Sequence, residues 1–326
     1  MKKLLSALLS RLDCGENAVL CSILASSGSS PRGAGAKMAV FSDGTTLGTI
    51  GGGAVELLAA SQAQDALKSG VSSLHAFDLS PDQVNSIGMV CGGAVTVYYQ
   101  ILSAQDRPML QKWLNALEEG RAAWLYLAFS EGSISEFSVF YKDELPEGGL
   151  FGAKTKITGD VYTEPLCSPG KVFIFGGGHV GAALVPVLSA VDFRVTVFDD
   201  RPEFANNARL PGAECVICGD YRNIFEKVTL TKDDYAVIMT PGHQADCEVL
   251  AQVLRTQAGY IGCIGSKKKV AHTNTQLLSQ GFNENDLARI HSPIGLDILA
   301  ETPAEIAVSI AAELIEHRAK HRRGET

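Results

Sequence analysis

The stretch Val172-Phe-Ile-Phe-Gly-Gly-Gly-His-Val-Gly181 decides the fold of the second half of the chain. A short apolar run leads directly into the spacing Gly-x-Gly-x-x-Gly, formed by Gly176, Gly178 and Gly181, at the start of a helical pattern. Glycines let the backbone turn tightly beside a pyrophosphate, and the helix that follows presents unpaired N–H groups and the positive end of its dipole. This order predicts a dinucleotide-binding loop.

An acidic residue stands where such a loop needs one. Asp199 closes the next apolar run, at about the spacing of a carboxylate that binds a ribose hydroxyl. Arg201 leaves a second possibility open, because an arginine at this place can accept a ribose 2′-phosphate instead. The residues predicted to bind the nucleotide are Gly176, Gly178, His179, Gly181 and Asp199.

Length and composition describe a globular protein with two domains. The chain has 326 residues, of which 46% are hydrophobic and 20% charged, enough to bury two cores. A net charge of −8 argues against nucleic acid as a partner, because phosphate binding on that scale needs a basic face. No apolar run reaches the roughly 18 residues of a membrane span. The eight cysteines follow no disulfide framework, which favours reduced thiols and a cytoplasmic location.

Patterning divides the chain into three segments. Residues 1–103 begin with leucines at helical spacing, typical of an amphipathic core helix rather than a signal peptide, and continue as strands with glycine turns. Residues 104–168 predict an intermediate α+β segment that ends in a linker over 142–168. Residues 169–326 alternate strand and helix. We therefore expect an α/β protein with a Rossmann-like, doubly wound parallel sheet after an N-terminal α+β domain.

Three further polar segments follow predicted strands of the second half, where ligands bind in open α/β sheets. They are residues 240–246, 265–269 and 291–297, and we expect them to converge on one crevice.

Several side chains in these segments are candidates for chemistry. His243 and Asp246 lie three residues apart at a helix start, so they can orient a proton or a metal from one side. Ser266 and Lys267 open a lysine-rich helix start that is either solvated or in contact with an anion. His291 is either a turn residue or an acid–base group.

The N-terminal half carries two loops suited to an anion and one unusual thiol. Arg32 and Lys37 flank a turn rich in small residues. The Gly51–Gly53 loop precedes the N-terminus of a predicted helix, and Glu56 lies one turn into that helix. Cys91 lies beside two glycines, which allow close approach to its sulfur. The residues predicted to bind a ligand here are Arg32, Lys37, Gly51, Gly52, Gly53, Glu56 and Cys91.

Taken in order, these segments resemble the XdhC/CoxI family, the xanthine dehydrogenase accessory factors. The resemblance covers most of the chain apart from residues 104–168. It rests on Gly28-Ser-Ser-Pro-Arg32, Gly48–Gly53 with Glu56, Cys91-Gly-Gly93, the Gly176–Gly181 loop, Gly262–Lys269, His291–Asp297 and Thr302-Pro-x-Glu305.

The resemblance implies a chaperone of molybdenum cofactor without turnover of its own and without catalytic residues. Members of the family are understood to bind this cofactor, assist exchange of an oxo for a sulfido ligand with a cysteine desulfurase, and deliver it to a molybdenum hydroxylase. Cys91 would be a possible molybdenum ligand, with Arg32, Lys37 and the Gly51 loop on phosphate or pterin. The ligand would be molybdopterin itself or a dinucleotide form, and the protein a cytoplasmic homodimer.

Two other classes of function stay open on the residues alone. In an NAD(P)-dependent oxidoreductase, the glycine loop and Asp199 would hold the cofactor, and His243 or His291 would act as acid or base. In a nucleotide-sensing scaffold, a ligand on the loop would only set the conformation. The chaperone is favoured because the N-terminal half adds Cys91 and two anion-suited loops, so that the loop at Gly176 would grip a large phosphorylated cofactor.

Overall fold

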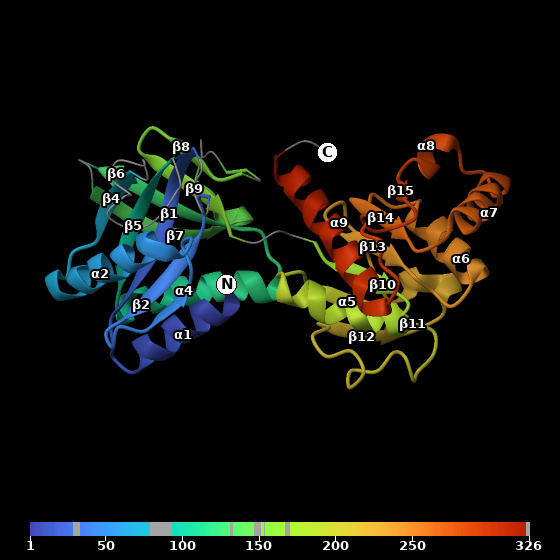
Figure 1. Ribbon diagram of the computed structural model, residues 1–326, viewed down its shortest axis with the longest axis horizontal. Helices are drawn as coiled ribbons and strands as arrows, with labels where there is room; N and C mark the ends of the chain where they lie inside the picture. Colours follow the sequence, from blue (N-terminus) through green and yellow to red (C-terminus); the bar gives the residue numbers. More distant parts are fainter. Residues whose placement is uncertain are drawn as a thin grey trace. The chain divides into compact units, whose positions relative to one another are not determined.

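The chain folds into two compact units, Met1–Ser168 and Pro169–Thr326 (Figure 1). The structure is a computed structural model that describes residues 1–28, 33–78, 93–130, 133–146, 151–152, 154–166 and 170–323. Two predicted binding residues, Arg32 and Cys91, lie outside these ranges.

The first unit is built on two antiparallel sheets. One has the strand order β3-β2-β1-β5-β4 and the other the order β7-β6-β9-β8. The strands of the first sheet are β1 (Ala18–Gly28), β2 (Lys37–Phe41), β3 (Thr46–Gly48), β4 (Ser73–Asp78) and β5 (Gly93–Leu102). Those of the second are β6 (Ala123–Ser130), β7 (Ser133–Tyr141), β8 (Lys156–Thr158) and β9 (Val161–Pro165).

Helices cover both faces of the first sheet. Alternate residues of β1 point to opposite sides, so that Leu20 joins the core beneath α1 and α4 while Val19 and Ile23 join the core beneath α2. The N-terminal leucines are all buried, which confirms the predicted core helix. The helical segments are α1 (Lys2–Asp13), α2 (Gly53–Ser69), η1 (Ala104–Asp106), α4 (Arg107–Glu119) and η2 (Lys142–Glu144).

The predicted linker over 142–168 is wrong in its second half, which contains β8 and β9. Strand β9 pairs with β6, and its Tyr162 is fully buried in the core that also holds α1. The sequence Val-Tyr-Thr-Glu-Pro of β9 has strand propensity, but the glycines and acidic residues around it hid the signal. Residues 104–166 thus share a core with the N-terminal segment.

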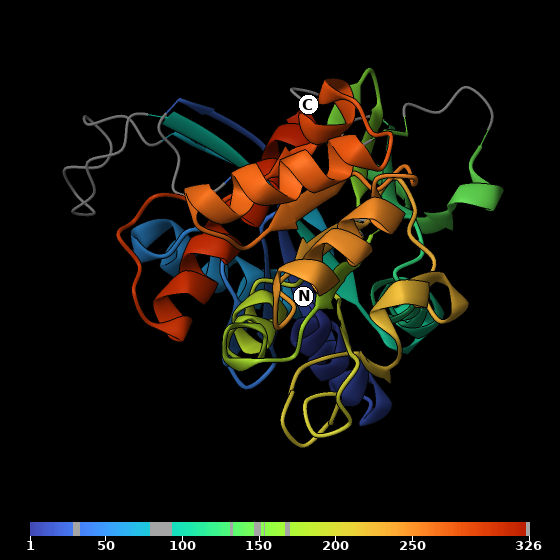
Figure 2. The same ribbon diagram turned by 90° about the vertical axis from the view of Figure 1, so that its right-hand side faces the viewer.

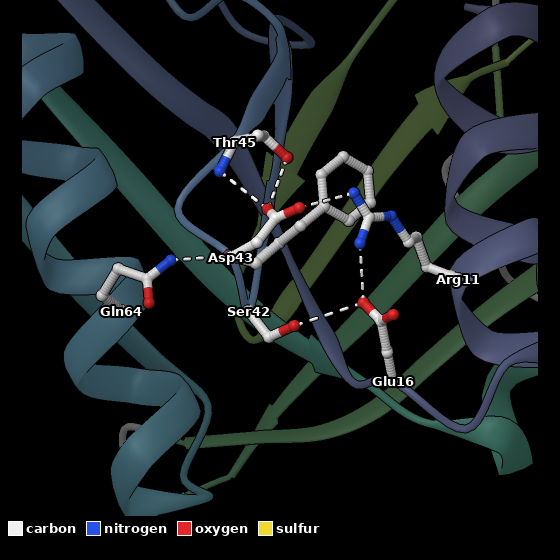
Figure 3. A network of polar contacts seen from close by, with 7 residues as sticks. Arg11, Glu16, Ser42, Asp43, Thr45 and Gln64 are labelled. Atoms are coloured by element: carbon white, nitrogen blue, oxygen red, sulfur yellow. Dashed lines mark hydrogen bonds and ion pairs between the residues drawn. The ribbon is translucent and has the colours of Figure 1, made fainter.

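A polar network ties α1 to the β2–β3 turn (Figure 3). Arg11 of α1 donates to Glu16 at 2.8 Å and to Asp43 at 2.7 Å. Asp43 also accepts from the backbone N–H and hydroxyl of Thr45. The Thr45 and Arg11 hydrogen bonds lower the pKa of Asp43 to about 2. Gln64 of α2 donates to the last carbonyl of β2, so both helices are fixed to one hairpin.

The second unit is built on a parallel sheet of order β12-β11-β10-β13-β14-β15. All of its strand pairs are parallel, and the order reverses between β10 and β13, as in doubly wound folds. The predicted fold class is therefore confirmed. The strands are β10 (Val172–Phe175), β11 (Val195–Asp199), β12 (Cys215–Cys218), β13 (Tyr235–Ile238), β14 (Tyr260–Cys263) and β15 (Ile290–His291).

Helices cover both faces of this sheet, and Figure 2 shows the orange helices α6 and α7 lying over one of them. In β10, Phe173 and Phe175 face the core of α6 and α7, whereas Val172 and Ile174 face the core of α5 and α9. No helix in the described parts of the chain is long and apolar enough to cross a membrane. The helical segments are α5 (His179–Ala190), η3 (Tyr221–Glu226), α6 (His243–Val253), α7 (Lys267–Ser279), α8 (Glu284–Leu287) and α9 (Pro303–Arg323).

Candidate functional site

The glycine loop after β10 has the packing that a dinucleotide-binding loop requires. A side chain at Gly176, where φ is +125°, would bring its Cβ to 2.3 Å from the Met239 carbonyl oxygen. A Cβ at Gly181 would lie 2.1 Å from the carbonyl oxygen of Gly176. Gly178 has open space around it and no side chain caps α5 here. The first N–H groups of α5 therefore remain without a side-chain acceptor and can meet an anion.

Asp199 lies beside this loop, but its carboxylate is already occupied. The side chain is fully buried, and its Oδ2 accepts from Gly177 N at 2.7 Å and from Arg201 Nη2 at 3.0 Å. Its Oδ1 accepts from Arg201 N at 3.0 Å and Nε at 2.9 Å. A carboxylate offers about four acceptor positions, so none is left for a ribose hydroxyl. Burial raises the pKa of Asp199, but the Arg201 and Gly177 hydrogen bonds outweigh it and lower the pKa overall.

Two arginines of the loop that follows β11 lie against the same aromatic ring, that of Phe204. The guanidinium of Arg201 lies 3.7 Å from the centre of the Phe204 ring, and that of Arg209 lies 4.7 Å from it. A Cβ at Gly177 would lie 2.8 Å from the Phe204 carbonyl oxygen, so this loop abuts the glycine loop. Arg209 carries no signal in the sequence, because its ten-residue separation from Asp199 fits no motif.

The carboxyl ends of three strands surround a hollow of about 640 Å³. Asp200 follows β11, the stretch Cys218–Arg222 begins at the last residue of β12, and Pro241–Ala245 spans the start of α6. Burial and the neighbouring Asp199 raise the pKa of Asp200. The hollow lies at the edge of the sheet where open α/β folds bind ligands. Among the predicted site residues that the structure describes, the exposed His243 is the one that lines it.

Asp246 differs from its predicted partner His243, because it is fully buried. Its Oδ1 accepts from Thr240 N at 3.0 Å and Oγ1 at 2.6 Å, and its Oδ2 forms an ion pair with Lys269. The two side chains therefore do not act from one side. Within the described residues, no group of three or more His, Cys, Asp or Glu can hold a metal ion.

No described side chain of the other two polar segments lines this hollow. Ser266 caps α7 by accepting from Lys269 N at 3.4 Å, and the side chain of Lys267 lies outside what the structure describes. His291–Pro293 and Gly295–Asp297 line a separate hollow beside α9. The expected convergence of all three segments on one crevice is thus not observed.

In the first unit, Lys37 is a buried member of an ion pair. Its side chain is 0% exposed, and Nζ lies 2.6 Å from Glu164 Oε2 on β9. Tyr162 donates to the same oxygen at 2.8 Å, and Nζ lies 5.5 Å from the centre of the Trp113 ring. The ammonium group is therefore not free to meet a phosphate in this structure. Its partner was missed because β9 falls in the expected linker.

The Gly51–Gly53 loop holds an anion that belongs to the chain itself. All three glycines have positive φ, of 136°, 75° and 63°, a conformation that favours residues without a side chain. Glu56 Oε2 accepts from the Thr49 hydroxyl, from Ile50 N at 3.2 Å and from Gly52 N at 3.0 Å. Burial raises the pKa of Glu56, but these hydrogen bonds lower it overall.

The sequence and the fold both match known proteins. Residues 172–314 match the XdhC Rossmann domain, and residues 12–78 match the XdhC and CoxI family. The chain belongs to the XdhC and CoxI family. The resemblance seen in the sequence is thereby confirmed.

Several known proteins align along most of this chain. A probable xanthine dehydrogenase subunit from Bacillus subtilis is 26% identical over 94% of this chain and 95% of its own length. The molybdenum cofactor insertion chaperone PaoD of Escherichia coli is 22% identical over 93% of this chain and 84% of its own length. The uncharacterized protein YqeB of Escherichia coli is 24% identical over 91% of this chain, which spans only 43% of YqeB.

A solved structure has the same fold as this XdhC and CoxI family member. It is the crystal structure of a protein described as a xanthine dehydrogenase from Bacillus halodurans. The TM-score is 0.83 at 26% identity, with 100% of this chain and 97% of the other covered.

Proposed function

We propose that this protein is an accessory factor that binds molybdenum cofactor and assists its sulfuration and insertion into a xanthine dehydrogenase-type molybdenum hydroxylase. The observation that carries the proposal is the alignment with the insertion chaperone PaoD over 93% of the chain. Membership in the XdhC and CoxI family supports the same role.

The glycine loop of the second unit suits the phosphate end of such a cofactor. Molybdopterin carries a phosphate, and the α5 N-terminus offers backbone N–H groups without a capping side chain next to the open position at Gly178. The hollow of about 640 Å³ beside His243 offers room for the rest of a large ligand. The saturated Asp199 gives no support to a nicotinamide dinucleotide held through its ribose.

The molybdenum end of the proposed cofactor would suit a cysteine thiolate as a transient ligand. When bound, the cofactor supplies a molybdenum centre whose oxo ligand is exchanged for a sulfido ligand. Burial raises the pKa of the Cys21, Cys247 and Cys263 thiols, that of Cys263 to about 12, so these stay protonated and are poor metal ligands. We propose Cys91 as the ligand, with Arg32 beside the cofactor.

The remaining partners are part of the same proposal. A cysteine desulfurase would supply the sulfur, a molybdenum hydroxylase would receive the finished cofactor, and the chain would work in the cytoplasm as a homodimer. The bound form would be molybdopterin or one of its dinucleotides.

Purification from cells that make molybdenum cofactor tests this function. We expect pterin, measured by fluorescence after oxidation, and molybdenum to co-purify with the wild-type chain. Cys91→Ala should lower the bound molybdenum and the activation of a co-expressed hydroxylase at least tenfold. Cys14→Ala, at an exposed cysteine after α1, is the matched control and should match the wild type. Absence of pterin and metal, with full activation by Cys91→Ala, would overturn the proposal.

A further inference from the structure

A second hollow, of about 540 Å³, lies between the loop after β15 and the second half of α9. It is separate from the hollow at the ends of β11, β12 and β13, and it contains no residue of the glycine loop. Its polar lining includes Tyr260, His291, Ser292, Glu313 and His317.

Glu313 of α9 orients the imidazole of His291. The Nδ1 atom of His291 lies 3.1 Å from Glu313 Oε1, which also accepts from the Tyr260 hydroxyl at 2.8 Å. Gly295 N donates to the other carboxylate oxygen. Burial raises the pKa of Glu313, but the bonds from His291, Tyr260 and Gly295 lower it overall. An ionised carboxylate only accepts, so Nδ1 carries a proton, and the tautomer that pairs with Glu313 has its lone pair on Nε2.

The loop that follows His291 is held firmly against its neighbours. A Cβ at Gly262 would lie 2.3 Å from the side chain of Ile294, which packs over β14 there. A Cβ at Gly295, where φ is +104°, would lie 2.3 Å from Ser309 Oγ on α9. Ser292 donates to the Cys263 carbonyl at 2.9 Å. His291 is therefore a positioned group and not an ordinary residue of a surface turn.

The His291 ring is the last of three aromatic rings that contact one another on neighbouring strands of the sheet. Tyr235 and Tyr260, on neighbouring strands, have ring centres 5.7 Å apart, and His291 stacks on Tyr260 at 4.5 Å with an interplanar angle of 25°. The His291 side chain is 45% exposed although Tyr260 covers one face. The opposite face and the edge of the ring therefore supply this exposure and are open to a planar ligand.

His317 forms another side of the hollow. It meets Tyr260 edge-on at 5.0 Å and His291 edge-on at 6.1 Å. Burial and the nearby His291 and His321 lower its pKa. Its Nδ1 is buried and has no hydrogen-bond partner within the described residues. The hollow thus combines aromatic rings with the Nε2 edge of His291.

We propose that this hollow binds a planar nitrogen heterocycle that donates a lactam N–H to the Nε2 atom of His291, at the edge of the imidazole ring. Purines and pterins share this chemistry. The pterin case rests on the proposed function, since it would make this hollow a site for the ring system of the cofactor, whereas the purine case does not depend on it.

Titration of the full chain with 6-hydroxymethylpterin, followed by its own fluorescence, and with hypoxanthine, followed by calorimetry, tests the proposal. We expect saturable binding of at least one of them and a loss of at least tenfold in affinity for His291→Ala. His272→Ala, at an exposed histidine on α7, is the control and should bind as the wild type does. A preference for the pterin or for hypoxanthine identifies the source of the ring.

A second variant tests the hydrogen bond to Nε2 through the group that orients the imidazole. Glu313→Gln leaves the ring of His291 in place but removes the charge that orients Nδ1, so affinity should fall between three- and tenfold. Circular dichroism checks that both variants are folded. Binding of neither probe, or unchanged affinity in a folded His291→Ala protein, would overturn the site. Neither result bears on cofactor co-purification or its dependence on Cys91, so the two proposals fail separately.

Discussion

Single backbone contacts decide which glycines of the loop between β10 and α5 tolerate a side chain. Gly178 has a φ of −63° and no atom within 4 Å of a Cβ, whereas Gly181 sits against the carbonyl of Gly176. The same motif therefore contains one position that is open to a ligand and one that is filled by the protein.

Gly181→Ala should lower the free energy of unfolding by about 2–3 kcal/mol, because the clash with the Gly176 carbonyl outweighs the better helix propensity of alanine. Gly178→Ala should cost at most about 1 kcal/mol, the loss of a favourable N-cap residue. Urea denaturation of both variants measures the difference. Equal values for the two would contradict the packing described for α5.

Lys37 and Glu164 should depend strongly on each other. Lys37→Met leaves a buried carboxylate without its cation, so we expect a loss of about 3–5 kcal/mol in the free energy of unfolding. Glu164→Gln should also destabilise, and the double variant should lose less than the sum of the two. A double-mutant cycle in urea gives the coupling. Strict additivity would show that the ion pair contributes nothing.

Arg201 controls access to Asp199. Removing the guanidinium in Arg201→Ala frees acceptor positions on the carboxylate, so a ribose hydroxyl can take its place. The affinity for NAD⁺ should rise by about tenfold, or ~1.4 kcal/mol. Calorimetry measures it, with Arg209→Ala as control, because Arg209 shares the contact with the Phe204 ring but not the hydrogen bonds to Asp199. A wild-type chain that already binds NAD⁺ more tightly than the variant would contradict this account.

At the scale of the element, α2 depends on a carboxylate that folds back on its own glycine loop. Glu56 satisfies N–H groups at the helix entrance that would otherwise lack an acceptor. A foreign anion in this loop would have to displace Glu56. The N–H groups of this loop are thus occupied by Glu56, whereas those at the N-terminus of α5 have no side-chain acceptor.

The lowered pKa of Glu56 predicts the sign of a pH effect. Its contribution to stability is fully present above the ordinary pKa of 4.5 and is lost as the pH falls through the lower pKa of the folded state. Glu56→Gln should cost about 1–2 kcal/mol at pH 7 and progressively less below pH 4. Urea denaturation of the wild type and the variant at pH 7 and below pH 4 measures this difference in the free energy of unfolding. The same loss at both pH values would rule out a charged Glu56 as the cap.

At the scale of the whole molecule, each unit has hydrophobic cores of its own. We therefore expect two transitions in calorimetry of the intact chain. Lys37→Met should shift only the transition of the first unit, and Gly181→Ala only that of the second. Both variants moving one common transition would show that the units unfold together.

The sequence alone determined the parts that depend on local pattern. Glycine spacing after an apolar run predicted the β10–α5 loop, helical spacing of leucines predicted α1, and strand–helix alternation predicted the parallel sheet. The ordered motifs identified the family. These features arise from neighbours within a few residues, where backbone freedom and periodic burial leave a direct trace in the sequence.

The tertiary structure decided which of the candidate side chains are free. It paired Lys37 with Glu164 across 127 positions, covered Asp199 with Arg201, buried Asp246 against Lys269, and joined His291 to Glu313. The physical reason is that the charge of a side chain is visible in the sequence, whereas the partner that neutralises or orients it comes from a strand or helix brought near only by folding. The glycine loop could be located from its residues, but its open position at Gly178 and its occupied carboxylate at Asp199 could not.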